Sequence, residues 1–363
     1  MSQPIKVGFI GLSTTGWAAS ALAPSLLQPS LQGKYNLVAV STTSEGSAKA
    51  SAEKYSTQTG HAVTAHHGDS SLISSNPNVE LVAVSVKAPM HKQVVLPVIE
   101  KKRDFFIEWP AGRNLKETIE IAEAAHRQGV KSFVGLQARN SPVIQKVKEL
   151  ISSGAIGSVR STTFVGLIPR ETHFWPPVIT PEYVFALDKA NGVTALNIAG
   201  GHQLDALTYL LGDFSTINAT ATTIYPTATV LDANGQVTSR TISTSIPDQH
   251  SISGVLKSGA LATISTSGRK LLLWEIDGEE GSIRMESNSS VFINLNNPTL
   301  YLNGERVEVE GSSSETVGIL GSAWAAYADG KKGQYATIDD AVKNHRLLDA
   351  IDRSLAEGKT IVL

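Results

Sequence analysis

Short apolar runs alternate with helical patterns over the first 138 residues. Each run is mostly apolar and about five residues long, as expected of a parallel strand buried on both faces. The helical pattern at Leu115–Gln128 is the clearest, with Gly129 placed to cap its C-terminus. Strands separated by crossover helices form a parallel sheet with helices on both faces, so we expect a doubly wound α/β domain in residues 1–138. The predicted strands are Ile5–Ile10, Asn36–Val40, Glu80–Val86, Asp104–Ile107 and Lys131–Leu136.

The pattern changes in residues 139–363, where β-branched stretches dominate. Asn-Gly pairs at 234–235 and 303–304 are strong hairpin signals, and short connections predict a mostly antiparallel sheet. We therefore expect a second, α/β domain with an open-faced sheet, and a loop at Gly311–Ser314. The predicted strands are Ser161–Val165, Thr216–Tyr225, Ser251–Leu256, Ala260–Ser267 and Leu271–Ile276, and the predicted helices are Val143–Ser152, Gly201–Leu211 and Asp339–Ala356.

Composition narrows the class of protein. A length of 363 residues suits two domains, and a net charge of −2 argues against a nucleic-acid partner. The absence of cysteine excludes disulfides, thiolate nucleophiles and iron–sulfur clusters. No apolar run is long enough to span a membrane, and the N-terminus lacks a signal-peptide plan, so we expect a soluble, cytoplasmic protein. His66 and His67 with Asp69 are too compact for a metal site, so no metal is expected.

A glycine-rich turn, Gly11–Gly16, follows the first predicted strand and precedes the helical run Trp17–Leu27. The dinucleotide-binding fingerprint has glycine at the first, third and sixth places, but the third place here is Ser13. The hydroxyls of Ser13, Thr14 and Thr15 can donate to phosphates, as can backbone N–H groups at the helix N-terminus. An ordinary tight turn and a serine-hydrolase elbow are the alternatives; the elbow needs glycine where Thr15 stands.

The second strand ends in hydroxyl side chains, Ser41 and Thr42 among them, and not in an acid. NAD-specific sites place Asp or Glu here to hold the ribose 2′-hydroxyl, and that carboxylate repels the 2′-phosphate of NADP. The hydroxyls therefore favour NADP over NAD, although no Arg or Lys stands beside them.

The chain resembles the glucose–fructose oxidoreductase/inositol dehydrogenase (Gfo/Idh/MocA) family over nearly its whole length, and most of all the fungal galactose-regulon repressor and its oxidoreductase-like relatives. The family implies a Rossmann domain followed by an α/β domain whose sheet commonly forms the subunit interface. The segments that carry the resemblance are Val7–Trp17, Glu108-Trp109-Pro110, Gly135–Pro142, Gly154–Val159, Pro181–Val193, Gly201–Asp205 and Pro247–His250.

Two departures from the family bear on catalysis. Family dehydrogenases have Glu-Lys-Pro where this chain has Glu108-Trp109-Pro110, so the usual acid/base lysine is missing. The Asp that often precedes the family His by four residues is Ile198 here, with Asn197 beside it, so His202 alone is kept. The repressor also lacks the lysine while keeping a dinucleotide site, so binding and hydride transfer are separate questions.

His202 and Lys87 are the catalytic candidates. His202 would carry the proton, and Lys87, which follows the fourth predicted strand, would replace the missing lysine. A core histidine satisfied by backbone and a solvated surface lysine are the alternatives. The cofactor-binding candidates are Gly11, Ser13, Thr14, Thr15, Gly16, Trp17, Ser41, Thr42, Lys87, His91, Glu108, Trp109 and Pro110.

The substrate-pocket candidates are Arg139, Trp175, Asn197 and Asp205. The alternative for Arg139 is that it links the two domains. The alternative for Trp175 is that it belongs to a loop that caps the sheet. Asp205 either orients the His202 imidazole or is a charge favoured by the helix dipole.

Two functions fit the sequence. The first is an NAD(P)-dependent oxidoreductase that moves hydride to or from a polar carbonyl or carbinol compound, with sugar-like compounds included. The alternative is a catalytically silent, dinucleotide-binding regulator that resembles the galactose-regulon repressor. For either function we expect a homo-dimer or higher homo-oligomer formed through the open sheet face, because the composition of that sheet predicts that both faces need cover.

Overall fold

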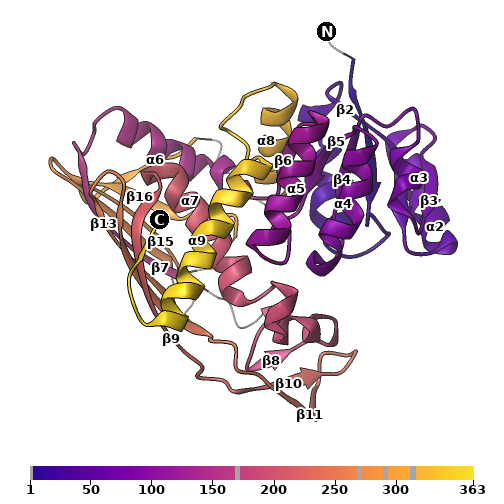
Figure 1. Ribbon diagram of the computed structural model, residues 1–363. Helices are drawn as coiled ribbons and strands as arrows, with labels where there is room; N and C mark the ends of the chain where they lie inside the picture. The colour runs from indigo at the N-terminus through magenta and orange to yellow at the C-terminus, as the bar shows by residue number, and fades with distance from the viewer. Residues whose placement is uncertain (1–2, 168–171, 268–271, 289–292, 311–315) are drawn as a thin grey trace. The chain divides into compact units, whose positions relative to one another are not determined.

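The computed structural model describes residues 3–167, 172–267, 272–288, 293–310 and 316–363, and it divides into two compact units (Figure 1). The first unit is Met1–Asn140 with Glu315–Val342, and the second is Ser141–Ser314 with Lys343–Leu363. The predicted boundary after residue 138 lies beside the first break. The return of residues 315–342 to the first unit was not predicted from the sequence.

The first unit is built on a six-stranded, all-parallel sheet in the order β3-β2-β1-β4-β5-β6. This confirms the predicted doubly wound sheet. Its strands are β1 (Ile5–Ile10), β2 (Tyr35–Thr42), β3 (Thr64–His67), β4 (Leu81–Val84), β5 (Asp104–Ile107) and β6 (Ser132–Val134). Its helices include η1 (Ala18–Leu22), α1 (Ala23–Leu26), α2 (Glu45–Thr59), α3 (Ser70–Ser74), η3 (Ala88–Met90), α4 (His91–Glu100), α5 (Leu115–Gln128), η4 (Gln137–Asn140) and α8 (Thr316–Ala328).

Local chemistry sets the ends of these elements. Helix α5 begins where the Asn114 side chain accepts from the N–H of Glu117, and it ends at Gly129, whose φ is +66°. Strand β3 was not predicted, because it is a four-residue edge strand whose residues are mostly exposed.

Helix α8 is the main element of the first unit that the sequence analysis missed. Its Trp324 is fully buried, with ring centroids 4.9 Å from Phe106 and 5.0 Å from Phe133. The Tyr35 hydroxyl donates to the Trp324 carbonyl oxygen over 2.7 Å. A helix that is apolar on most sides is stable only when buried, and this one completes the core over β1, β5 and β6.

The second unit is built on a nine-stranded sheet in the order β17-β16-β15-β14-β7-β13-β12-β9-β18. Every pair is antiparallel except β7 with β13, so the prediction of a mostly antiparallel sheet is confirmed. The strands are β7 (Val159–Leu167), β9 (Phe214–Thr222), β12 (Gln249–Leu256), β13 (Leu261–Ser267), β14 (Leu272–Gly278), β15 (Ser282–Ser287), β16 (Thr299–Leu302), β17 (Glu305–Val307) and β18 (Ile361–Val362).

Both predicted hairpins are present. Asn303 and Gly304, with φ of +54° and +84°, join β16 to β17 in a two-residue turn. Asn234 and Gly235 lie in a longer connection between β10 (Thr227–Leu231) and β11 (Val237–Ser243), which form a small sheet with β8 (Val178–Ile179). The predicted loop at 311–314 lies outside the described residues.

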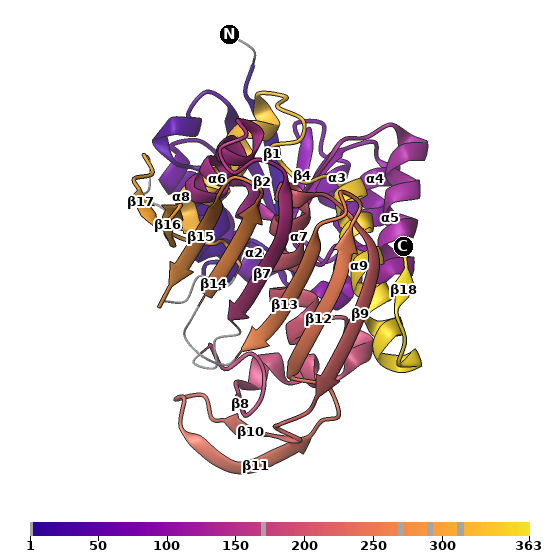
Figure 2. The ribbon, with the colours of Figure 1, turned by 90° about the vertical axis from the view of Figure 1, so that its left-hand side faces the viewer.

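The two faces of the large sheet differ in chemistry. Side chains such as Phe164, Ile252 and Ile264 are buried on the face covered by α7 (Gly201–Leu211). Hydroxyl side chains such as Ser253 and Thr263 are exposed on the other face, and Figure 2 shows no helix of the described residues in front of it. The composition of the sheet predicts that both faces need cover. In the structure, strand alternation sends most of the large apolar side chains to the face covered by α7. The remaining helices of this unit include α6 (Pro142–Ser152) and η8 (Leu196–Gly200), and α9 (Ile338–Glu357) enters it at Lys343.

Candidate functional site

The glycine-rich turn brings the end of β1 against the end of β4. Gly11 has a φ of +88°, and a Cβ at this position would lie 1.9 Å from the carbonyl oxygen of Ser85. Only glycine fits such an approach. The first glycine of the fingerprint is thus required by the backbone, as the motif predicts.

Helix α2 holds the carbonyl groups of the turn from behind. The Ser51 hydroxyl donates to the Leu12 carbonyl over 2.6 Å, and the Lys54 ammonium donates to the Thr14 carbonyl over 2.9 Å. Within the described residues, nothing accepts a hydrogen bond from the backbone N–H of Ser13 or Thr14. These two N–H groups belong to the peptide groups whose carbonyls, those of Leu12 and Ser13, accept from the Ser51 and Tyr55 hydroxyls of α2. The N–H groups therefore point away from α2, and N–H groups of this kind bind phosphate.

The side chain at the third fingerprint position serves the turn itself. The Ser13 hydroxyl donates to the Thr15 carbonyl oxygen over 2.6 Å. The expectation that this hydroxyl faces a phosphate is therefore not met in this structure. Thr14, Thr15 and Gly16 are exposed, and Trp17, which follows them, is 41% exposed.

The hydroxyls at the end of β2 are bonded to one another. The Thr42 and Ser47 hydroxyl oxygens lie 2.5 Å apart, and Ser44 caps α2 by accepting from the N–H of Ser47. Ser41 is buried. Sequence reasoning missed Glu45, a carboxylate just past this cluster in the first turn of α2, where it pairs with Lys49 at 2.7 Å.

Glu108, at the carboxyl end of β5, is held by the segments after two other strands. Its Oε1 accepts from the indole N–H of Trp17 over 2.9 Å. Its Oε2 fills the space left by Gly135, where a Cβ would lie 2.7 Å away. Burial raises the pKa of Glu108 to about 7, although the Trp17 hydrogen bond acts in the opposite direction. The sequence indicated each of the three residues, but not that they meet.

Trp109, Pro110 and His91 pack and bond within the protein in this structure. Trp109 is buried, and the peptide bond to Pro110 is cis. His91 is also buried, and its ring nitrogens lie 2.7 Å from the Pro110 carbonyl oxygen and 3.0 Å from that of Val86. Burial lowers the pKa of His91 despite these two contacts. A direct bond from this ring to a cofactor would break one of them, which favours the helix-opening role over the cofactor role. Lys87, by contrast, is exposed.

In the second unit, His202 lies where the π-helical turn η8 passes into α7. It is 4% exposed, and its Nδ1 has no hydrogen-bond partner within the described residues. Burial lowers the pKa of His202 to about 3. The expectation that this imidazole carries the proton is therefore not supported, because its charged form is strongly disfavoured at neutral pH.

Asn197 and Trp175, two of the predicted substrate-pocket residues, are ordered by contacts with the backbone. The Asn197 amide donates to the Gly192 carbonyl over 3.2 Å, and the Trp175 indole donates to the Val193 carbonyl over 3.0 Å. Asp205 is 1% exposed, so it is not an exposed charge at the helix terminus. Sequence reasoning missed Asn344 of α9, whose amide donates to the Gly201 carbonyl over 2.9 Å; nothing in its sequence context marks it.

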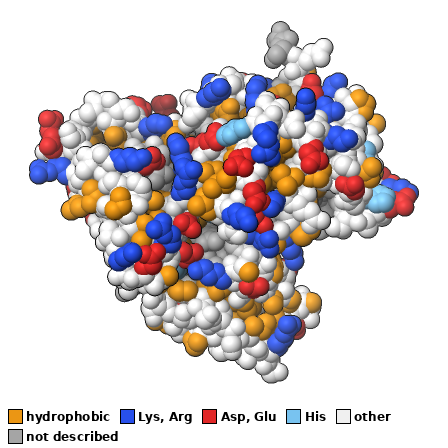
Figure 3. Space-filling model, viewed as in Figure 1, with side chains coloured by type: hydrophobic (Ala, Val, Ile, Leu, Met, Phe, Trp, Pro, Cys, Tyr) orange, Lys and Arg blue, Asp and Glu red, His pale blue; other side chains and the backbone are white. Residues whose placement is uncertain are grey.

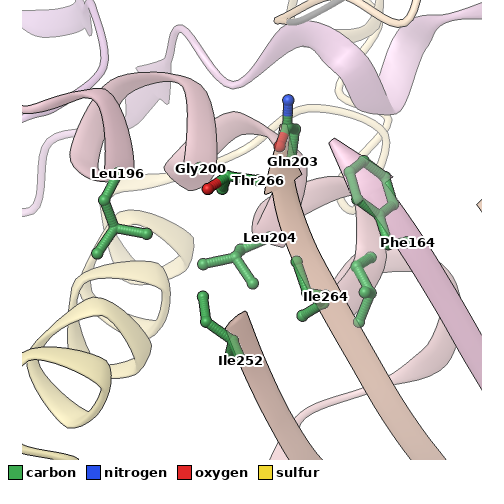
Figure 4. Close-up of a pocket in the computed structure, with 9 residues that line it drawn as sticks. Phe164, Leu196, Gly200, Gln203, Leu204, Ile252, Ile264 and Thr266 are labelled. Atoms are coloured by element: carbon green, nitrogen blue, oxygen red, sulfur yellow. The ribbon is translucent and has the colours of Figure 1, made fainter. Parts of the chain in front are cut away.

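The underside of α7 packs on the large sheet around a small apolar cavity. Figure 4 shows Leu204 of α7 among Ile252, Ile264 and Phe164 of the strands. The cavity has a volume of about 10 Å³, too small for any substrate. The side chains around the cavity hold α7 on the sheet, and this packing fixes the position of His202 at the start of the helix.

Arg139, predicted to line a substrate pocket or tie the domains, is 7% exposed and pairs with Asp340 at 3.2 Å. Both residues belong to the first unit. Burial alone would raise the pKa of Asp340, but Arg139 and hydrogen bonds from Thr337 lower it overall. The Arg139 guanidinium is thus engaged in a partly buried ion pair.

The surface charge, the helix lengths and the arrangement of His, Asp and Glu side chains do not indicate another site among the described residues. Lys/Arg and Asp/Glu side chains are interspersed over the face shown in Figure 3. Among the described helices, none is both long enough and apolar enough to cross a bilayer. Within the part of the chain that the structure describes, no three His, Asp or Glu side chains form a group that could hold a metal.

Known proteins match both parts of the chain. A family model described as an oxidoreductase family with an NAD-binding Rossmann fold matches residues 5–136, and one for the C-terminal domain of Gal80p matches residues 142–287. Dehydrogenase aclE of Aspergillus oryzae is 31% identical over 99% of this chain and 98% of its own length. The galactose/lactose metabolism regulatory protein GAL80 of Kluyveromyces lactis is 30% identical over 87% of this chain and 70% of its own length. A crystal structure of a super-repressor mutant of Gal80p from Saccharomyces cerevisiae has a TM-score of 0.87 at 24% identity, covering 99% of this chain and 98% of that one.

Proposed function

We propose that this chain, which belongs to the Gfo/Idh/MocA oxidoreductase family with an NAD-binding Rossmann fold, is a nicotinamide-dinucleotide-dependent oxidoreductase of a polar carbonyl or carbinol compound. The observation that carries the proposal is the turn at Gly11–Gly16. Side chains of α2 fix the Leu12 and Ser13 carbonyls, and within the described residues the N–H groups of Ser13 and Thr14 have no acceptor and can bind an anion. Backbone N–H groups in this position of the fold can bind the pyrophosphate of a dinucleotide.

The residues of the first unit fit a dinucleotide in three respects. Gly11 allows the close approach of the backbone that the fold requires. The strand order reverses at β1 and β4, and ligands of open α/β sheets bind at the carboxyl ends of the strands at this point. The hydroxyls of Thr42 and Ser44 stand where the ribose is expected, and from them we propose that NADP is accepted at least as well as NAD.

Oxidation of a carbinol to a carbonyl removes one hydride and one proton, and a bound nicotinamide dinucleotide supplies the hydride acceptor. In the reverse direction, negative charge builds on the substrate oxygen, so a hydrogen-bond donor is needed there. We assign this donor role to neutral His202, with the proton exchanged with water. A pKa of about 3 suits a neutral donor better than an acid.

A specific observation favours a second candidate function, that of a catalytically silent dinucleotide-binding regulator. Trp109 stands in place of the family lysine and is 5% exposed, and an indole cannot ionise. The match of residues 142–287 to the Gal80p C-terminal domain points in the same direction. In this case the first unit would bind the dinucleotide without turnover.

Two measurements test the proposal. Calorimetric titration with NAD and NADP, supported by thermal unfolding, tests binding; a ligand at 100 times its Kd adds about 2.7 kcal/mol of stability. A screen of carbonyl and carbinol compounds at the nicotinamide absorbance then tests turnover. Binding with turnover supports the oxidoreductase, binding without turnover across the screen supports the regulator, and absence of binding rejects both.

A further inference from the structure

The Trp17–Glu108 hydrogen bond crosses the ligand-binding edge of the first unit. Trp17 follows the turn after β1, Glu108 follows β5, and β4 lies between these strands in the sheet. The bond therefore passes over the carboxyl end of β4, beside the point where the strand order reverses. A dinucleotide whose pyrophosphate lies on the turn after β1 has its nicotinamide end on this side.

The carboxyl group of Glu108 lies in a crowded setting. Within the described residues, no cationic side chain forms an ion pair with it, and its one hydrogen-bond donor is the uncharged indole of Trp17. The titratable and charged groups on the neighbouring elements are His91, with both ring nitrogens against carbonyl oxygens, and Lys87, which is exposed after β4. Charge interactions are strong in such a setting, because little water screens them.

We propose that Glu108 is the counter-ion of the oxidised nicotinamide ring, so that the chain binds the oxidised dinucleotide more tightly when this carboxyl is ionised. The inference rests on the proposed dinucleotide site. The oxidised ring carries a positive charge and the reduced ring carries none. A carboxylate beside the ring therefore distinguishes the two redox forms, whereas a protonated carboxyl does not.

The direction of the pH effect follows from the state of the free protein. With a pKa of about 7, Glu108 is about half ionised at neutral pH. A cation beside it favours the ionised form, so binding of the oxidised dinucleotide lowers this pKa and releases a proton. Affinity for the oxidised form thus rises as the pH rises through 7, while affinity for the reduced form stays level.

The test is calorimetric titration of the full chain with NAD⁺ and with NADH between pH 6 and 8. If the pKa falls by about two units in the complex, NAD⁺ affinity rises about tenfold over this range and about half a proton is released at pH 7. Titration in buffers of different ionisation enthalpy measures that proton. A parallel pH dependence for NAD⁺ and NADH overturns the inference.

Three variants sharpen the result. Glu108→Gln should remove the pH dependence and hold NAD⁺ at or below the affinity that the parent shows at pH 6, with NADH unaffected. In the parent, the hydrogen bond from the Trp17 indole lowers the pKa of Glu108. Trp17→Phe removes this bond, so it should raise that pKa and move the midpoint of the pH dependence to higher pH, while the preference for NAD⁺ is kept. Glu123→Gln makes the same charge change on the exposed side of α5 and should match the parent.

The outcomes separate the two proposals. If neither redox form binds to the parent, the proposed dinucleotide site fails. If both forms bind, but Glu108→Gln keeps the pH dependence, the site stands and only the counter-ion role fails. Should Glu108→Gln not fold, the NAD⁺ and NADH profiles of the parent, with Trp17→Phe, still decide the matter.

Discussion

The turn after β1 and the start of α7 are the two parts of this chain that carry candidate chemistry, and they are built differently. The turn is made from peptide groups, with Gly11 allowing the approach and α2 fixing the carbonyls. The region of His202 depends on side chains, and there the imidazole is buried and strongly disfavoured as a cation.

The difference shows why binding and catalysis separate in this chain. A backbone site tolerates Ser13 in place of a glycine, because the N–H groups of Ser13 and Thr14 belong to the backbone and do not depend on the side chain at the third position. A side-chain site does not tolerate the exchange of lysine for Trp109, because no indole supplies a proton at neutral pH. We therefore expect dinucleotide binding to persist without the lysine, whereas turnover depends on whether neutral His202 can donate a hydrogen bond to the substrate oxygen.

The largest effect is expected from a charge placed on the turn. Ser13→Asp sets a carboxylate against the pyrophosphate, and like charges in contact cost several kcal/mol, so affinity for NAD and NADP should fall by about 10³. Calorimetric titration measures the loss. Ser13→Ala removes only the hydroxyl bonded to the Thr15 carbonyl and should bind within a few-fold of the parent. Binding by Ser13→Asp within tenfold of the parent would mean that the phosphates lie elsewhere.

His202→Ala tests the side-chain region. If the chain turns over a substrate, loss of a neutral donor to the substrate oxygen should lower kcat by about 10², with dinucleotide affinity unchanged. Since His202 has a pKa of about 3, no titration of this imidazole should appear in the rate between pH 5 and 8. His126→Ala, at an exposed histidine of α5, is the control.

Lys87→Met tests whether Lys87 replaces the lysine that family dehydrogenases have at position 109 or is only a surface residue. A lysine that replaces the family group should cost about 10²–10⁴ in rate when removed. Its exposed position favours the surface alternative, in which Lys87→Met turns over like the parent. A large loss in both His202→Ala and Lys87→Met would restore the two-residue site that the sequence suggested.

The elements with a regular apolar pattern were predictable from the sequence. The ends of β1, β5 and α5 agree with the prediction residue for residue, because an apolar run or a cap defines each. Strand β3 and helix α8 were not found. The first has too few apolar residues to show a period, and the second is apolar on most sides, so its burial depends on a distant partner.

The site was predictable as a set of residues but not as a set of contacts. The sequence indicated Trp17 and Glu108 separately, and only the fold shows that they meet. It also gave no sign that His202 would be buried with no partner for its Nδ1 among the described residues, or that Asn344 would reach Gly201. These features come from tertiary packing, which local pattern does not encode.

Thr42→Asp probes how specific the backbone site is. A carboxylate at the end of β2 can hold the ribose 2′-hydroxyl and repels a 2′-phosphate, so the variant should shift preference toward NAD by about tenfold, or 1.4 kcal/mol. Competitive titration of NAD against NADP measures the ratio. Thr57→Asp places the same charge on the exposed side of α2 as a control. A parent that already prefers NAD tenfold would show that Glu45, and not the hydroxyl cluster, sets the preference.

The smallest effect concerns the uncovered face of the large sheet, through which we expect self-association. Leu261, at the start of β13, is 60% exposed on this face, opposite Val255 of β12 and Ser161 of β7. A symmetric dimer presents the same patch twice, so Leu261→Arg places two like charges in one interface and should weaken the dimer by about fivefold. Val237→Arg, on the exposed strand β11, should leave it unchanged. Sedimentation at micromolar concentration decides the point: a monomeric parent would show that water alone covers this hydroxyl-rich face.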